Sequence, residues 1–265
     1  MEIAYFGDRN SHTFAAASAA FDKKEKFVGF DTIRQVVSAL LSGADVAVVP
    51  MENSVEGYVN ETLDCLLSQS VYISREIILP IHQSLIAAKG AKKEDIKTIY
   101  SHPQALSQCR KYLAENFPEA ALVASKSTSD GLKKITDKSI AAIARNSDGE
   151  NTFVMSANVE DFDANTTRFV VLSKKPTFDG NNCSIIFETA NVPGALAKVL
   201  ITLADKGLNM TKIQSRPAKT KLGRYVFFVD FVFDGDKDEL MEFLSVLQRS
   251  TEMLKFSGKY ESVGF

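Results

Sequence analysis

The order of two kinds of pattern along the chain restricts its fold more than any other feature. In the first part of the chain, short apolar runs alternate with stretches of helical periodicity. The apolar runs predict strands at 2–6, 45–50, 71–79, 98–101, 121–125 and 139–144. The periodic stretches predict helices at 13–21, 31–42, 61–69, 103–115 and 128–137. Several strands are apolar almost throughout, which is typical of parallel sheets covered on both faces, so we expect an α/β domain.

A change of this order divides the chain. The segment SKKPTFDGNN, residues 173–182, is polar, contains Pro and Gly and lacks periodicity, so it is predicted to be a linker. After it the pattern predicts a strand (CSIIFET), a helix over 193–206, two strands (LNMTKIQSRP and RYVFFVDFVF), a helix over 236–249 and a strand (LKFSGKYE). This βαββαβ order is ferredoxin-like. We therefore expect domains over 1–175 and 182–265, joined by a linker over 176–181.

Composition and charge exclude several classes of protein. The formal net charge of −2 gives no electrostatic reason to expect a nucleic-acid or acidic-membrane partner. The longest apolar runs are too short to span a membrane, and the N-terminal stretch MEIAYFGD lacks the pattern of an export signal. Three distant cysteines, Cys65, Cys109 and Cys183, fit neither a disulfide framework nor a zinc site. We expect a cytoplasmic enzyme or binding protein.

Polar side chains follow four of the predicted strands, at the junctions with the helices. The four junctions are GDRNSHTF (7–14), PMENSVEGYVNETLDCL (50–66), SHPQALSQC (101–109) and SKSTSDG (125–131). Open α/β sheets bind ligands at the carboxyl ends of their strands. Each junction alone is better explained by helix capping, for example by Ser101 or His102 ahead of Pro103, or by Ser127 or Thr128. The four junctions together favour one shared ligand site.

The polar groups of these junctions also restrict the chemistry. They are mainly hydroxyls and amides, and the motif NTTRF at 165–169 adds an arginine beside two threonines. The sequence contains no glycine-rich phosphate loop and no G-x-G-x-x-G, G-x-S-x-G or H-E-x-x-H motif. The three histidines, His12, His82 and His102, lack metal-ligand spacing. We therefore expect no metal and no cofactor, and a reaction that uses weak acids and anion-binding groups.

Three long motifs resemble those of one enzyme family. ENSVEGYVNETLD resembles E-N-S-x-x-G-x-V-x-x-T-x-D, SHPQALSQC resembles S-H-P-Q-A-L-x-Q-C, and NTTRFVVL resembles N-x-T-R-F-x-V-L of the prephenate dehydratase catalytic domain. NVPGAL and QSRP resemble the G-A-L and E-S-R-P segments of the ACT regulatory domain. The resemblance covers nearly the whole chain. It implies a two-lobed fold like that of periplasmic binding proteins, with lobe 1 at about 1–76 and 160–175 and lobe 2 at about 77–159, followed by a ferredoxin-like ACT domain.

The resemblance implies the decarboxylating dehydration of prephenate to phenylpyruvate, CO₂ and water, a step of phenylalanine biosynthesis. Prephenate is a dianion whose ring becomes aromatic in the reaction, so the enzyme needs to hold carboxylates and help hydroxide depart. Thr167 is then the catalytic residue, and Arg168 is expected to clamp a substrate carboxylate. Because side chains of a strand alternate, Thr166 and Thr167 should face opposite sides. The further implied substrate contacts are Ser11, Asn53, Ser54, Ser101, Gln104, Gln108, Thr128 and Phe169.

The ACT resemblance implies allosteric regulation by phenylalanine, bound where two ACT domains meet in a homodimer or homotetramer. Pro193 and Gly194 are expected at a helix start, where free N–H groups bind a carboxylate. Gln214 replaces the family's Glu, which keeps a hydrogen-bond acceptor but removes a charge. The alternative is that this domain only dimerises. The implied effector contacts are Asn191, Val192, Pro193, Gly194, Ala195, Leu196, Gln214, Ser215, Arg216 and Pro217.

The sequence departs from the family in two further places, and two other functions remain open. Residues 7–13 read GDRNSHT where the family has G-P-x-G-T-F-S, so Arg9 and His12 are unusual. The segment before NTTRF lacks the family's A-A-x-x-Y-G-L signature. The alternatives are an arogenate dehydratase and a non-catalytic amino-acid sensor. No chorismate mutase helix precedes residue 1, so a fused bifunctional enzyme is not expected.

Overall fold

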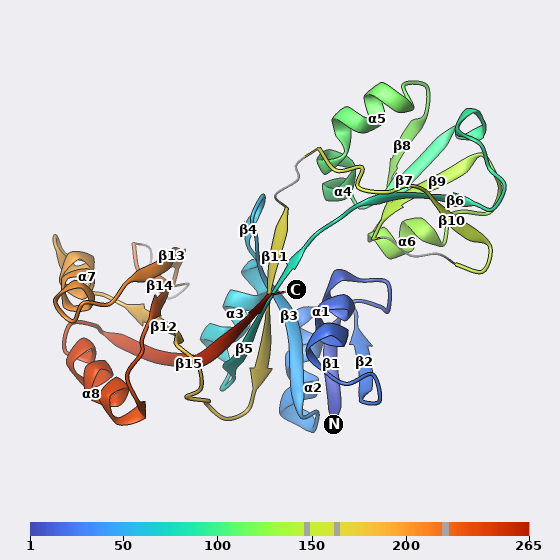
Figure 1. Cartoon of the computed structure of the whole chain (residues 1–265). Coiled ribbons are helices and arrows are strands. Elements are labelled where there is room, and N and C mark those ends of the chain that lie inside the picture. Colours follow the sequence, from blue (N-terminus) through green and yellow to red (C-terminus); the bar gives the residue numbers. More distant parts are fainter. Residues whose placement is uncertain (146–148, 162–164, 219–222, 265) are drawn as a thin grey trace.

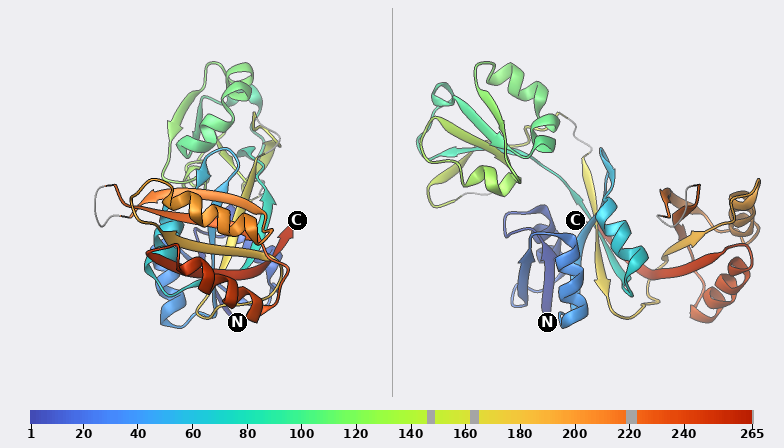
Figure 2. Two further views of the ribbon diagram at one scale, coloured as in Figure 1. Left: turned by 90° about the vertical axis from the view of Figure 1, so that its left-hand side faces the viewer. Right: turned by 180° about the vertical axis from the view of Figure 1, so that it is seen from behind.

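The protein is described by a computed structural model, which covers residues 1–145, 149–161, 165–218 and 223–264. It consists of two lobes formed by the N-terminal part of the chain and a separate C-terminal domain (Figure 1). Lobe 1 lies in the middle, with lobe 2 on one side and the C-terminal domain on the other, as both figures show (Figure 2). Among the described residues, no helix combines the length and apolar character needed to span a bilayer.

Lobe 1 is a mixed sheet with helices on both faces. Its strands lie in the order β5-β11-β3-β1-β2, with β4 paired to β3. β1 is parallel to β2 and β3, whereas β11 is antiparallel to both β3 and β5. The strands are β1 (Glu2–Phe6), β2 (Lys26–Phe30), β3 (Val46–Asn53), β4 (Gly57–Tyr58), β5 (Tyr72–Pro80) and β11 (Thr166–Ser173). The helices are α1 (His12–Ala20), α2 (Ile33–Ser42) and α3 (Asn60–Ser68).

The side chains of β11 alternate between the two faces of this sheet. Phe169 and Val171 pack in the core against α1, with Ala16 and Ala17. Val170 packs in the core on the other face, against α2 and α3. Thr167 therefore faces the same side as Phe169, and Arg168 faces the opposite side.

Lobe 2 is a smaller sheet in the order β10-β6-β9-β7-β8. β7 is parallel to both β8 and β9, so the carboxyl ends of these three strands lie at one edge of the sheet. The strands are β6 (Ser84–Ala88), β7 (Thr98–Ser101), β8 (Ala121–Ala124), β9 (Ile140–Ala144) and β10 (Thr152–Ser156). The helices are η1 (Lys93–Asp95), α4 (Pro103–Gln108), α5 (Arg110–Asn116) and α6 (Thr128–Leu132).

The passage from lobe 1 to lobe 2 lies a few residues beyond the boundary of about 77 that the family resemblance implied. β5 remains in the lobe 1 sheet as far as Pro80, and Ile77 and Ile81 are buried in the lobe 1 core. The strand continues to Pro80 because it stays paired with β11 up to that residue. Strands β2, β6 and β10 were not predicted, and the helix expected over 103–115 is divided at Cys109 into α4 and α5.

The C-terminal domain has the predicted βαββαβ order and a sheet in the order β13-β14-β12-β15. Helices α7 and α8 cover the face that points away from lobe 1 (Figure 2). Val199 and Leu203 of α7 and Leu240 and Phe243 of α8 form its core with the sheet. The elements are β12 (Asn182–Glu188), α7 (Ala195–Asp205), β13 (Met210–Pro217), β14 (Tyr225–Val232), α8 (Lys237–Gln248) and β15 (Met253–Gly264).

Strand β15 joins the two domains into one sheet of ten strands. Its first part pairs with β12, and residues 261–264 run parallel to residues 75–78 of β5. Figure 1 shows β15 passing from the C-terminal domain to lobe 1, where it lies along β5 at the edge of the lobe 1 sheet. Gly258 lies at the crossing, where a Cβ atom would collide with the carbonyl of Ile73. The predicted linker also packs in place, because Phe178 stacks on Phe256 of β15 with 5.4 Å between ring centroids.

Candidate active site

Thr167 meets the side chain of Asn53 at the start of β11. The two residues are paired across β11 and β3, and Asn53 Nδ2 donates a hydrogen bond of 2.9 Å to Thr167 Oγ1. The side-chain oxygen of Asn53 accepts from the backbone N–H groups of Val55 and Glu56 at 3.0 and 3.2 Å, which fixes the orientation of its amide. Because Thr167 Oγ1 accepts from Asn53, its own proton is available to another acceptor.

A chain of amides continues from Asn53 to lobe 2. Asn53 Nδ2 also donates to Asn165 Oδ1 at 2.7 Å, and Asn165 Nδ2 donates to Gln108 Oε1 at 3.2 Å. Gln83 Nε2 reaches the same oxygen of Gln108 at 3.5 Å. Asn165, Gln108 and Gln83 are all buried. The structure thus brings together the predicted residues Thr167, Asn53 and Gln108, and adds Asn165 and Gln83, for which the sequence analysis gave no role.

Thr166 and Ser54 hold the loop after β3 against β11. The backbone N–H of Thr166 donates to Ser54 Oγ at 2.9 Å, and the backbone N–H of Ser54 donates to the carbonyl of Thr166 at 2.8 Å. Thr166 is half-buried and, one position from Thr167 in the strand, faces the other side of the sheet, as expected. Ser54 therefore supports the position of Thr167 through the backbone.

The structure contradicts the expectation that Arg168 clamps a substrate carboxylate. Its guanidinium is 5% exposed and forms an ion pair with Glu76 and another, at 2.7 Å, with Asp230. Nη2 donates to Tyr260 Oη at 2.8 Å. The cause is strand alternation, which turns the side chain of Arg168 to the face opposite Thr167. Its charge is already neutralised by carboxylates of the protein.

Three other predicted contacts have structural partners instead. Phe169 is 1% exposed in the lobe 1 core, and Ser101 is fully buried, donating to the carbonyl of Ile143 at 2.6 Å. The expectation of substrate contact is therefore contradicted for both residues. Ser11 caps α1, accepting from the Phe14 N–H at 3.1 Å. Ser11 is thus a helix cap, which was the alternative that the sequence left open, whereas α4 is capped by His102 and not by Ser101.

Two further side-chain contacts connect the two lobes. Ser129 Oγ donates to Asp8 Oδ1 at 2.7 Å, and the side chain of Glu56 is hydrogen-bonded to Gln104. Thr128, which precedes Ser129, is half-buried at the first position of α6. The predicted residues Gln104 and Thr128 therefore lie on the lobe 2 side of this junction.

A cation and a buried histidine lie at the same junction. Arg145 directly follows β9, and its Nε reaches the carbonyl of Asn10 at 3.5 Å. In the part of the chain that the structure describes, no ion pair includes Arg145. His12 Nε2 is buried without a hydrogen-bond partner among the described residues. Burial, with the positive charge of Arg145 as the next cause, lowers the pKa of His12 to about 4, so its ring is neutral at neutral pH.

Comparison with known proteins decides the family. The sequence profile described as prephenate dehydratase matches residues 3–177, and that of the ACT domain matches residues 184–245. The chain belongs to the prephenate dehydratase family. It is 40% identical over 254 residues to the prephenate dehydratase of Lactococcus lactis subsp. lactis, covering 91% of this chain and 89% of that protein. The family resemblance and the fold class inferred from the sequence are thereby confirmed, and the protein is an enzyme of this family.

Two solved structures share nearly the whole fold of this chain. The prephenate dehydratase of Arthrobacter aurescens, in complex with L-Phe, has a TM-score of 0.90 at 28% identity and covers 98% of this chain and 90% of its own. GqqA, described as a novel type of quorum quenching acylase, has a TM-score of 0.86 at 25% identity and covers 99% of this chain and 98% of its own.

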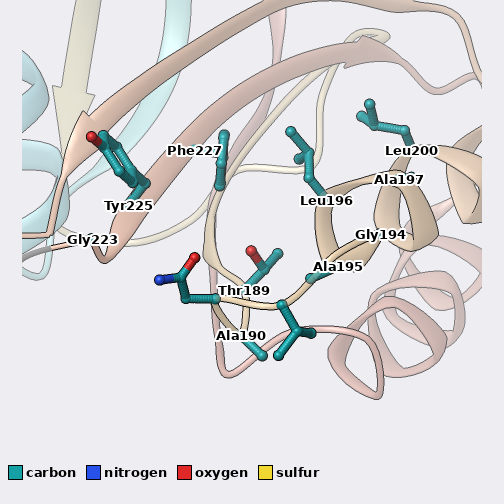
Figure 3. A pocket seen from close by; sticks show the side chains of 12 residues that line it. Thr189, Ala190, Gly194, Ala195, Leu196, Ala197, Leu200, Gly223, Tyr225 and Phe227 are labelled. Atoms are coloured by element: carbon teal, nitrogen blue, oxygen red, sulfur yellow. The ribbon is translucent and has the colours of Figure 1, made fainter.

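The ACT domain of the dehydratase contains a pocket of about 460 Å³ at the start of α7. Figure 3 shows Tyr225 and Phe227 of β14 on one side of it and Leu196 and Leu200 of α7 on the other. Gly194 caps α7 with a φ of 81°, a left-handed conformation that favours glycine, and leaves the first N–H groups of the helix free of a side-chain cap. Of the predicted effector residues, the pocket is lined by Asn191, Val192, Gly194, Ala195 and Leu196.

The second predicted effector segment lies elsewhere in the same chain. Gln214, Ser215, Arg216 and Pro217 belong to β13, the edge strand of the sheet. Arg216 is bound to lobe 1, where it pairs with Asp64 Oδ1 at 2.9 Å and donates to the carbonyl of Asn60 at 2.5 Å. Within one chain, the two effector segments therefore do not form a single pocket.

Proposed function

We propose that this member of the family converts prephenate to phenylpyruvate at the junction of the two lobes, with Thr167 assisting the departure of the hydroxyl group. The hydrogen bond from Asn53 to Thr167 Oγ1 is the observation that supports this role. It leaves the threonine proton available to a ligand, and it strengthens the hydroxyl as a donor because hydrogen bonds in a chain polarise one another.

The proposed step balances without a cofactor. The bond between the ring and its carboxylate breaks, and CO₂ leaves. The electron pair of that bond enters the ring and expels the oxygen at the opposite ring carbon as hydroxide. A dianion thus becomes the phenylpyruvate monoanion, CO₂ and hydroxide. The Thr167 O–H binds the departing oxygen as its charge grows, and the amide of Asn53 stabilises the charge drawn onto Oγ1.

The dianion needs a cation that Arg168 does not supply, and we assign this role to Arg145. The guanidinium of Arg145 lies at the carboxyl end of β9, at the edge where α/β sheets bind ligands. Partial burial lowers the pKa of Arg145, so a carboxylate would compensate for the desolvation of its charge. The nearby acid Glu160 is already bound to His82, at 2.7 Å, and to the Gln83 N–H, at 2.8 Å. Gln104 and Thr128 complete the proposed donors on the lobe 2 side.

A direct assay tests the reaction and its substrate. Purified protein incubated with prephenate should produce phenylpyruvate, detected by its ultraviolet absorption, faster than the spontaneous reaction. The same protein with arogenate should produce phenylalanine more slowly, because the arogenate amino group adds a positive charge beside Arg145. A preference for arogenate would replace prephenate as the substrate, and product from neither compound would refute the proposed reaction.

We further propose that phenylalanine binds the ACT pocket and regulates the enzyme. The N–H groups in the first turn of α7, which has no side-chain cap, suit an α-carboxylate, and Leu196, Tyr225 and Phe227 suit an aromatic ring. The related enzyme of Arthrobacter aurescens has been solved in complex with L-Phe. Because Gln214 lies on the edge strand, we propose that it reaches the effector of a second copy in a dimer or tetramer. Activity and molecular mass measured with and without phenylalanine test both statements.

A further inference from the structure

Arg168 closes a ring of four side chains that spans two domains. Its guanidinium donates to Tyr260 Oη at 2.8 Å and pairs with Asp230 Oδ2 at 2.7 Å. Ser184 Oγ donates to Asp230 Oδ1 at 2.5 Å and lies 2.6 Å from Tyr260 Oη. Since Tyr260 accepts from Arg168 and Ser184 donates to Asp230, the tyrosine proton is directed to Ser184. We call Arg168, Tyr260, Ser184 and Asp230 the inter-domain ring.

Three members of the inter-domain ring belong to three adjacent strands of the ACT sheet. Ser184 lies on β12, Asp230 on β14 and Tyr260 on β15, and β12 is in the middle. All four residues are at least nine-tenths buried. A buried ion pair is stable only while its geometry is complete, because each charge has lost its water. A shift of the ACT strands relative to β11 would therefore break these bonds or move β11.

A second ion pair connects the same two domains beside the ring. Lys212 of β13 pairs with Glu52 of β3 at 2.6 Å, and Glu52 is paired with Arg168 across the two strands. Glu52 and Arg168 are the chain neighbours of Asn53 and Thr167. The two residues that contact the ACT domain thus alternate with the two residues of the candidate active site, on opposite faces of the same pair of strands.

We propose that Arg168 and Glu52 are positioning residues, through which the ACT domain sets the alignment of Thr167 with Asn53. The proposal rests on the catalytic role proposed for Thr167. While the ACT domain stays in one arrangement, β11 and β3 remain in register at Thr167 and Asn53. The hydrogen bond of 2.9 Å from Asn53 Nδ2 to Thr167 Oγ1 is then preserved. A phenylalanine molecule that favours another arrangement of the ACT strands would act on Thr167 by the same route, without contact with the substrate.

The test uses three variants of the full-length protein. Tyr260→Phe and Ser184→Ala each remove hydroxyl bonds of the inter-domain ring, and Lys212→Gln removes the adjacent ion pair at a half-exposed position. Tyr72→Phe is the matched control, because it deletes a tyrosine hydroxyl on β5 that belongs to neither contact. We measure kcat and KM for prephenate, the activity that remains at saturating phenylalanine, and phenylalanine binding by calorimetry.

The three variants should lower kcat while KM stays close to that of the native enzyme, since misalignment of catalytic groups by about 1 Å costs up to about 100-fold in rate. The coupling between phenylalanine and activity should change by about 2- to 30-fold, whereas phenylalanine should still bind. A purely structural role would lower the thermal midpoint and leave the kcat and coupling of the folded protein unchanged. That result in Tyr260→Phe and Lys212→Gln would overturn the proposal, even if Ser184→Ala failed to fold. An inactive native protein would instead refute the proposed function, and the positioning roles with it.

Discussion

Replacement of Thr167 by valine separates the chemistry of the hydroxyl from its contribution to the fold. Valine has nearly the same shape as threonine, so the packing beside Phe169 is preserved. Asn53 Nδ2 loses the acceptor at 2.9 Å but keeps Asn165 Oδ1 at 2.7 Å. The cost to stability should therefore be close to that of one lost hydrogen bond, about 1–2 kcal/mol. In a domain of this size, that lowers Tm by about 2–8 °C.

The catalytic cost of Thr167→Val should be much larger than this. A group that transfers or donates a proton in the transition state contributes about 10²–10⁴-fold in rate, which corresponds to about 3–5 kcal/mol in the barrier. Because the variant stays folded at 25 °C, kcat should fall by at least about 100-fold. Initial rates of phenylpyruvate formation at saturating prephenate measure this loss, and calorimetry measures Tm in the same samples.

Thr166→Val is the matched control for this experiment. It makes the same chemical change one position earlier, on the face of β11 that does not meet Asn53. The bond from its backbone N–H to Ser54 is retained, so kcat should stay close to the native value. A Thr167→Val enzyme with near-native kcat, or an equal loss in Thr166→Val, would refute the role given to Thr167.

Three further predictions follow from the charged groups of the structure. Arg168→Lys should lower Tm and kcat but leave KM nearly unchanged, because the buried guanidinium contacts protein carboxylates; a large rise in KM would restore the clamp hypothesis. Arg145→Gln should raise KM for prephenate about 10-fold or more with little change in Tm. Arg249→Gln changes the net charge equally at an exposed position, so it should leave KM unchanged. The pKa of His12 is about 4 in the folded protein, whereas its ordinary value is 6.5. Between these two pH values only the unfolded chain binds the proton, so the free energy of unfolding should decline as the pH falls from 6.5 to 4. His12→Phe should flatten this part of the Tm–pH curve, and an unchanged curve would show that His12 does not titrate as stated.

The sequence predicted the fold and several residues of the candidate active site because both depend on local patterns. The alternation of apolar strands and helices indicated the α/β domain, and strand alternation placed Thr166 and Thr167 on different faces. The same rule, applied one residue further, places Arg168 away from Thr167. The family motif suggested a substrate contact for Arg168 from its residue type, and the geometry of the strand shows that the motif also includes residues of the domain interface.

The remaining features depend on contacts between distant parts of the chain. Asn165 lies in the motif NTTRF, but its bond to Gln108 joins residues 57 positions apart, and Asn53 is 112 positions from Asn165. The sequence around Ser101 does not distinguish a hydroxyl that binds a ligand from one that donates to the carbonyl of Ile143. Arg145 carries no motif at all. His12 did carry a signal, because it stands where the family motif has an aromatic residue.

The pairing of β15 with β5 has a consequence for how the protein unfolds. Residues 261–264 hydrogen-bond along β5, and Ser262 Oγ donates to Glu76 Oε1 at 2.8 Å, so the catalytic sheet has no free edge at this strand. A catalytic segment of residues 1–175 expressed alone would expose that edge with Ile77 in it, which is a template for aggregation. Lobe 1 and the ACT domain should therefore melt as one cooperative unit, whereas lobe 2 has a sheet of its own and can open separately.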